Sequence, residues 1–158
     1  MKQHTYLCDV EWTGNDGEGT KTYKRYRRDH VITCDGKPAI PGSSDPSFRG
    51  DPTRYNPEEF LVASLSSCHM LSYLHLCAVN NINVLEYRDR AEGIMRENPD
   101  GSGEFLHAVL SPQVRIEAGG DLEKAADLHH KAHSLCFIAR SVNFPVDVKP
   151  VIQSKLVV

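Results

Sequence analysis

Two cysteines have the clearest potential for chemistry in this 158-residue sequence, because thiols act as nucleophiles, metal ligands or redox groups. Cys68 lies in a long uncharged stretch, and Cys136 lies far downstream in a histidine-rich segment. A thiol becomes reactive when a nearby cation lowers its pKa. Candidate cations precede Cys68 in the sequence: Arg25, Arg27, Arg28, Arg49 and Arg54. The alternative is that both cysteines are small buried apolar residues, as most free cysteines are.

The segment that carries Cys68 is predicted to be a long helix. Asn56, Pro57 and the acids that follow supply an N-cap, a proline at the first helical position and negative charge in the first turn. The helix should run from about Pro57 to Asn80. No charged residue occurs from Phe60 to Leu85, but the serines and histidines of this stretch would be costly in a bilayer. We therefore expect a buried helix and no membrane span, and its nearly uniform apolar surface indicates a partner subunit.

The position of Cys68 on that helix limits how its thiol could be activated. It lies too far from the helix start for the dipole to matter, so an arginine from elsewhere is required. That arginine would need a carboxylate to hold it, and Glu58 is the natural choice. Ten residues of helix separate Glu58 from Cys68 by about 15 Å. Either an arginine bridges part of this distance, or the two residues come from different chains.

The remaining sequence predicts an α+β domain with an antiparallel sheet. Strands and turns are expected before the helix, including a strand within residues 21–33, a turn at Asp35–Gly36 and a loop over 38–54. Two long strands, Asn83–Arg96 and Phe105–Glu117, should form a hairpin. Asp121 should cap a second helix that runs to about Ala139. The expected segments are 1–55 for the N-terminal strands and loop, 56–80, 81–118, 120–140, and 144–158 for a C-terminal strand.

Composition excludes several function classes. The net charge is −3, so no excess of positive charge indicates nucleic-acid binding. The N-terminal residues lack the apolar run of a signal peptide, so we expect a cytoplasmic protein whose five cysteines are mostly reduced. An odd number of cysteines cannot close completely into internal disulfides.

Two motifs together resemble those of a known family. The run Asn56-Pro-Glu-Glu-Phe-Leu-Val-Ala-Ser-Leu-Ser-Ser-Cys68 and the downstream His133-Ser-Leu-Cys136 are similar to the OsmC/Ohr family of thiol-dependent hydroperoxidases. The order of strands and helices fits along nearly the whole chain. Tyr55 before the first motif and Phe137 after the second depart from the usual pattern, which indicates a divergent OsmC-like branch. The resemblance implies a single OsmC-like domain over 1–158, with antiparallel sheets around two long helices in an intertwined homodimer.

The resemblance also implies a reaction. Cys68 would be the peroxidatic cysteine and Cys136 the resolving cysteine, with Glu58 holding the activating arginine. Arg49 is the first choice for that arginine, Arg28 the alternative, and Arg54 the third. Cys68 would reduce an organic hydroperoxide to an alcohol in oxidative-stress defence, and an external dithiol, a lipoyl group or a small thiol, would regenerate it. No cofactor is implied.

Two other functions remain open. The first is a metal site, because zinc takes histidine and cysteine ligands, although no standard ligand spacing is present. Its candidate ligands are His129, His133 and Cys136 on the second helix and His69, His75 and Cys77 on the first. The second is a non-catalytic ligand-binding dimer with inert cysteines.

Several residues are expected to have plainer roles. His129 and His130 should be exposed helix residues, and Cys8, Cys34 and Cys77 are given no chemistry. Five apolar residues could form either a substrate pocket or ordinary core: Phe60, Leu65, Leu71, Phe137 and Phe144.

Overall fold

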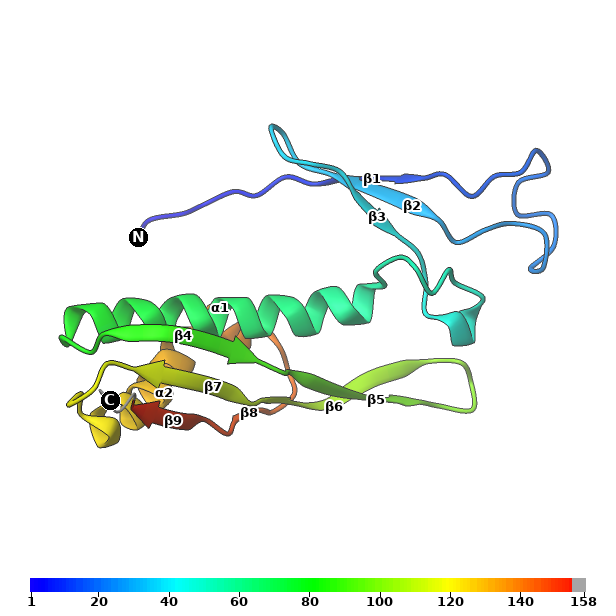
Figure 1. Ribbon diagram of the computed structural model, residues 1–158. Coiled ribbons are helices and arrows are strands. Elements are labelled where there is room, and N and C mark those ends of the chain that lie inside the picture. The colour runs from blue at the N-terminus through cyan, green and yellow to red at the C-terminus, as the bar shows by residue number, and fades with distance from the viewer. Residues whose placement is uncertain (155–158) are drawn as a thin grey trace. The chain divides into compact units, whose positions relative to one another are not determined.

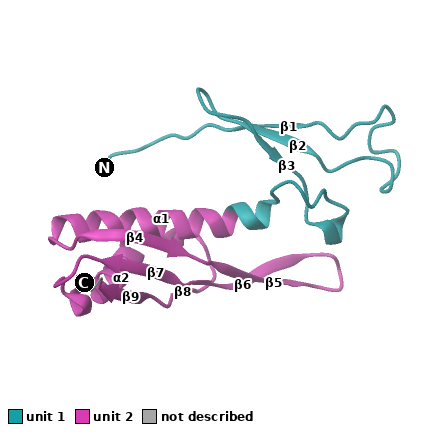
Figure 2. Ribbon diagram, viewed as in Figure 1, with its two compact units in different colours: residues 1–60 teal, residues 61–158 magenta. Residues whose placement is uncertain are grey.

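The structure is a computed structural model, and it describes residues 1–154. Two compact units make up the chain, Met1–Phe60 and Leu61–Val158 (Figure 2). The last four residues of the C-terminal strand expected over 144–158 lie outside the described residues.

The first unit contains a three-stranded antiparallel sheet in the order β1-β2-β3 (Figure 1). Its strands are β1 (Asp9–Trp12), β2 (His30–Thr33) and β3 (Ile40–Gly42). The expected turn at Asp35–Gly36 joins β2 to β3, and Gly36 adopts a positive φ of 71° that glycine tolerates. The strand expected within 21–33 is confined to β2. The residues before it form an irregular loop, which is closed by a hydrogen bond from Trp12 Nε1 to the Arg27 carbonyl.

The expected loop over 38–54 contains β3 and a short 3-10 helix, Pro46–Phe48. Asp45 caps this helix by accepting the Ser47 N–H, and Arg49 ends it in the left-handed conformation with a φ of 68°. Gly42 then forms an isolated bridge with Tyr55, so the end of the loop returns to the sheet just before the long helix.

The long helix, α1, spans Pro57–Val79. Its start is a reciprocal capping box: Asn56 Oδ1 accepts the Glu59 N–H at 2.8 Å, and the Glu59 carboxylate accepts the Asn56 N–H at 3.1 Å. The sequence-based prediction of this helix start is therefore confirmed.

The two long strands expected as one hairpin are each divided. The first becomes β4 (Val84–Asp89) and β5 (Glu92–Glu97), and the second becomes β6 (Gly103–Leu110) and β7 (Pro112–Ile116). β5 pairs with β6, whereas β4 pairs with β7 in a different sheet. Asp89 stabilises the division because its carboxylate accepts the Ser111 N–H at 2.7 Å, just before Pro112.

The expected C-terminal strand is also divided, into β8 (Val146–Val148) and β9 (Val151–Ser154). β8 runs parallel to β6 and β9 runs parallel to β7. The sheets of the second unit, β5-β6-β8 and β4-β7-β9, are therefore mixed, where a wholly antiparallel arrangement was expected. The parallel pairing arises because the chain crosses over through a helix between β7 and β9.

That crossover helix, α2, spans Leu122–Leu135, with Asp121 as its N-cap as expected, and a 3-10 helix, Ala139–Ser141, follows it. Tyr73 and Leu76 of α1 pack with Ala125 and Leu128 of α2 and with β7 in one apolar cluster. A second cluster packs Leu65 of α1 against β6 and β8. The second unit is thus an α+β fold in which both helices pack on mixed sheets.

The described part of the chain contains one helix, α1, that could cross a membrane by length and composition, and 28% of its apolar window is buried. The buried positions Leu65, His69 and Tyr73 follow one face. On the opposite face Leu71 is 63% exposed, and Val79 at the end of the helix is 61% exposed. The expectation that this helix is covered on nearly all sides is therefore not met within a single chain.

Candidate active site

The structure brings the two predicted redox cysteines together. Cys68 is half-buried in the middle of α1, Cys136 is fully buried at the end of α2, and their thiols share a hydrogen bond. Burial, together with this hydrogen bond, raises the pKa of Cys136 to about 11. Cys136 therefore keeps its proton near neutral pH and can donate it in this hydrogen bond.

Cys136 reaches this position because α2 ends earlier than expected. The helix predicted to run to Ala139 stops at Leu135, and Cys136 is its C-cap in an extended conformation with a ψ of 109°. The Ala139 N–H then points at the Cys136 sulfur, at 3.4 Å. Backbone N–H donors stabilise a thiolate, so the turn after α2 favours ionisation of Cys136 while its burial opposes it.

A buried histidine pair lies next to the cysteines in the sequence and links the same two helices. His69 Nε2 and His129 Nδ1 are 2.9 Å apart, and the His129 ring stacks on Tyr73 at a centroid distance of 3.7 Å. Burial lowers the pKa of His69 to about 4 and that of His129 to about 3. Both rings are neutral at physiological pH and hold α1 against α2.

The expectation that His129 is exposed is wrong, whereas His130 is exposed as expected. His129 is buried because it follows the alanine and leucine stripe of α2 that faces α1. The spacing of Ala125, His129 and Ala132 is the sequence signal that could have identified this position.

Glu58, Arg49 and Arg28 belong to the first unit, and Cys68 and Cys136 belong to the second. Arg28 is already engaged: its guanidinium lies over the rings of Tyr23 and Tyr26 and donates to the carbonyls of the same two residues. By contrast, the side chains of Arg49 and Glu58 have no ion-pair or hydrogen-bond partner within residues 1–154, and no ion pair joins them to each other.

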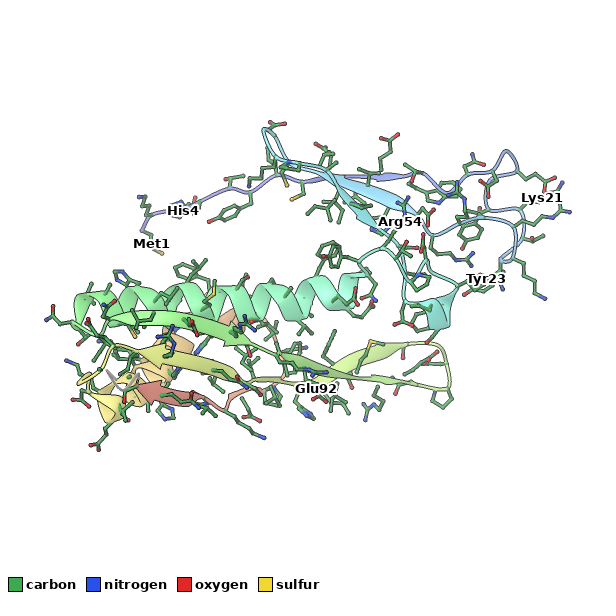
Figure 3. All side chains as sticks on the ribbon, in the orientation of Figure 1. Met1, His4, Lys21, Tyr23, Arg54 and Glu92 are labelled. Atoms are coloured by element: carbon green, nitrogen blue, oxygen red, sulfur yellow. The ribbon has the colours of Figure 1, made fainter. Side chains whose placement is uncertain are left out.

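Arg54, the third choice and one of the side chains labelled in Figure 3, lies between two acids of the first unit. Its Nε lies 3.6 Å from Asp51 and 4.0 Å from the buried Asp29. Its Nη1 is buried and, among the described residues, has no hydrogen-bond partner. The family resemblance placed Arg54 third because it is based on motif spacing. Spacing does not show that two acids hold the Arg54 side chain.

The five residues considered for an apolar pocket separate into two groups. Leu65 and Phe144 belong to the core of the second unit, and Phe60 packs on Tyr55 in the first. Leu71 is exposed one turn after Cys68, and Phe137, next to Cys136, is 81% exposed. Leu71 and Phe137 therefore expose apolar side chains close to the two cysteines in the sequence, but they do not enclose a pocket.

The metal-site alternative has no geometric support. Within residues 1–154, no three histidine, cysteine, aspartate or glutamate side chains converge where an ion could bind. His75 is exposed and Cys77 is buried in the core, so these candidate ligands are separated.

A hydrogen-bonded cysteine pair between two helices that pack on mixed sheets defines an α+β protein with the OsmC-like fold. The family model described as OsmC-like protein matches residues 50–151, which include both cysteines. The chain belongs to this family. No curated protein matches the chain.

Solved structures agree with this assignment. An OsmC-like protein of unknown function from Vibrio cholerae is 34% identical, with a TM-score of 0.84 over 94% of this chain and 100% of that one. An organic hydroperoxide resistance protein OsmC from Legionella pneumophila is 19% identical, with a TM-score of 0.69 over 97% and 99%. The organic hydroperoxide resistance protein OhrB of Bacillus subtilis is 21% identical, with a TM-score of 0.60 over 94% and 98%. The last two likenesses concern the fold alone.

Proposed function

We propose that this protein is a thiol-dependent peroxidase that reduces organic hydroperoxides to alcohols. The observation that carries the proposal is the hydrogen-bonded pair of Cys68 and Cys136, in which the buried Cys136 keeps its proton and the half-buried Cys68 is the more accessible member. Membership in the OsmC-like family supports the same function, since structural neighbours include proteins named for organic hydroperoxide resistance.

The reaction follows from the two thiols. The thiolate of Cys68 attacks the O–O bond, takes one oxygen as a sulfenic acid and releases the alcohol, whose proton comes from solvent. The Cys136 thiol then condenses with the sulfenic acid, so a disulfide and one water molecule form. An external dithiol reduces the disulfide by exchange and is itself oxidised, which restores both thiols.

Activation of Cys68 is assigned to Arg49, with Glu58 as the carboxylate that holds it and Arg28 as the alternative. Arg49 is the better choice because Arg28 is occupied by two tyrosines. Glu58 lies ten residues before Cys68 on the same helix, about 15 Å along its axis. An arginine that contacts both sites, or a Glu58 from a second chain, meets the requirement.

A homodimer accounts for this geometry and for the surface of α1. Leu71 leaves apolar surface uncovered on the face of α1 opposite to its buried positions, as does Val79 at the end of the helix, and a second copy of the chain would cover this surface. In such a dimer the site would lie at the interface, with Leu71 and Phe137 available to contact an apolar peroxide. We place this dimer in the cytoplasm, where its five cysteines, all free in the structure, would stay reduced between turnovers.

Steady-state peroxide consumption tests the proposed function. With a dithiol in excess, the wild-type protein should consume cumene hydroperoxide at least about ten times faster than hydrogen peroxide, because Leu71 and Phe137 favour an apolar substrate. Cys68→Ser should lose this activity. The matched control is Cys77→Ser on the same helix, since the serine hydroxyl keeps the hydrogen bond of Cys77 to Tyr73. If Cys68→Ser consumes the peroxide as fast as Cys77→Ser, Cys68 is not the peroxidatic cysteine. If the wild-type protein itself consumes no more peroxide than the dithiol alone, the function is instead that of a ligand-binding dimer with inert cysteines.

A further inference from the structure

A second pair of cysteines lies in the first unit, far along the chain from Cys68. The Sγ atoms of Cys8 and Cys34 are 3.0 Å apart. The pair extends the β1–β2 ladder by one step, because Asp9 pairs with Thr33 and the residues beyond them are Cys8 and Cys34. Residues opposite each other on antiparallel strands have Cα atoms about 4.5–5.5 Å apart, and disulfides form at about 4.4–6.8 Å. The strand register therefore places these thiols where they can be joined without moving the backbone.

This pair is accessible, unlike the other thiol to which no role is assigned. Cys8 is exposed and Cys34 is half-buried, whereas Cys77 is buried in the core of the second unit. Cys34 is the first residue of the turn that precedes β3, and its carbonyl accepts the Lys37 N–H. Because Cys8 is exposed and Cys34 is half-buried, a small disulfide or dithiol can reach this end of the hairpin from solvent.

We propose that Cys8 and Cys34 form a reversible dithiol–disulfide couple that exchanges with small-molecule disulfides and dithiols, separately from Cys68 and Cys136. Oxidation takes two exchange steps. The thiolate of one cysteine attacks the external disulfide and forms a mixed disulfide, with release of one thiolate. The other cysteine, as thiolate, then attacks the protein sulfur of the mixed disulfide, which closes the Cys8–Cys34 bond and releases the second external thiolate. The two cysteines lose two electrons to the external disulfide, and their two protons go to solvent or to the released thiolates.

The two thiols act as one unit, because their mutual hydrogen bond is also the main cause that raises the pKa of the Cys8 thiol. The closed bond would tie the residues before β1 to the turn after β2. The couple thus controls whether the N-terminal segment is covalently fixed to the sheet.

Oxidised glutathione is a suitable probe, used on the full chain with Cys68→Ser and Cys136→Ser so that the central pair cannot react. The proposal predicts one intramolecular disulfide between the peptides that contain Cys8 and Cys34, with no glutathione retained on the protein. Adding Cys8→Ser should stop the reaction at a stable glutathione adduct on Cys34. Adding Cys77→Ser instead should leave the internal disulfide unchanged.

Retained glutathione on both Cys8 and Cys34, or two thiols that stay free in excess oxidised glutathione, would overturn the proposal. The same mapping on the wild-type chain gives the answer if the double variant does not fold, because the Cys8 and Cys34 peptides are distinct from those of the central pair. The peroxidase proposal is tested separately. Cys8→Ser and Cys34→Ser should consume peroxide at the wild-type rate, and loss of activity in Cys68→Ser should leave the Cys8–Cys34 disulfide intact.

Discussion

His69 on α1 and His129 on α2 share one buried hydrogen bond, with 2.9 Å between His69 Nε2 and His129 Nδ1. Neither ring is exposed to solvent by more than 1%. The remaining nitrogens, His69 Nδ1 and His129 Nε2, have no hydrogen-bond partner among the described residues. A proton added to either ring would therefore be a buried charge, and for His69 the carboxylate of Asp89 offsets the cost of burial only in part, so the pair holds the two helices together only while it is neutral.

This relationship predicts a loss of stability in mild acid. The pKa of His69 is lowered from 6.5 to about 4 and that of His129 to about 3, so the unfolded chain binds protons below pH 6.5 that the folded chain does not. The stabilisation that the two neutral rings contribute is fully present above pH 6.5, and it is lost as the pH drops toward 4. Between pH 6.5 and 5 the free energy of unfolding should decrease by about 2 kcal/mol or more. Urea unfolding at a series of pH values measures this.

His129→Phe is the variant that assigns the pH effect to the pair. The phenyl ring keeps the stacking on Tyr73 and cannot titrate, so the stability of this variant should depend less steeply on pH. His75→Gln on the exposed face of α1 controls for the loss of a histidine as such. An unchanged slope in His129→Phe would contradict the account.

Asp89 is predicted to stabilise the point where the long strands divide between sheets. Its carboxylate accepts the Ser66 hydroxyl of α1 at 2.5 Å and the Ser111 N–H at 2.7 Å. Asp89→Asn should lower the free energy of unfolding by about 2 kcal/mol, because hydrogen bonds to a charged group contribute about 1.5–3 kcal/mol. Ser66→Ala should cost about 1 kcal/mol. Chemical denaturation should show that the two effects are not additive, and strict additivity would mean that the contact contributes nothing.

Cys136→Ser should separate the two steps of the proposed reaction. Cys68 should still react with the first equivalent of hydroperoxide, but no disulfide can form, so a sulfenic acid should accumulate on Cys68. A sulfenic-acid-specific dione probe with peptide mapping measures this. Labelling of the wild-type protein, in which Cys136 is present, should be at least about ten times weaker. Equal labelling of both proteins would remove Cys136 from its role as the resolving cysteine.

Arg49→Ala should slow the reaction of Cys68 with organic hydroperoxide by at least about tenfold, because a thiolate loses its stabilising cation. Arg28→Ala should leave that rate nearly unchanged and destabilise the first unit, since Arg28 lies over Tyr23 and Tyr26. Single-turnover rates measure the first effect and thermal unfolding the second. If Arg28→Ala is the slow variant, the activating arginine is Arg28 and its tyrosine contacts must open in the dimer.

Local signals in the sequence were sufficient for the helix starts and one turn. Asn56, Asp121 and Gly36 act through neighbours within four residues, and the structure confirms all three. The division of the long strands was not predictable in this way, because Asp89 pairs with residues 22 and 23 positions away. Burial of His129 likewise depends on His69, 60 residues distant.

The candidate site was predictable to a similar degree. Motif spacing identified Cys68 and Cys136, and the structure places them in contact through a hydrogen bond. The early end of α2 that makes this contact possible depends on the turn formed by residues 136–139, which no periodicity indicates. The pairing of Cys8 with Cys34 required the exact register of β1 and β2, and a one-residue slip would have separated them.

The most direct test of the central claim is peptide mapping after one equivalent of cumene hydroperoxide is added to the fully reduced wild-type protein without external thiol. The account predicts that one disulfide forms, between Cys68 and Cys136, with one alcohol molecule released per chain. If Cys68 remains a free thiol while the peroxide stays intact, the proposed peroxidase function is wrong.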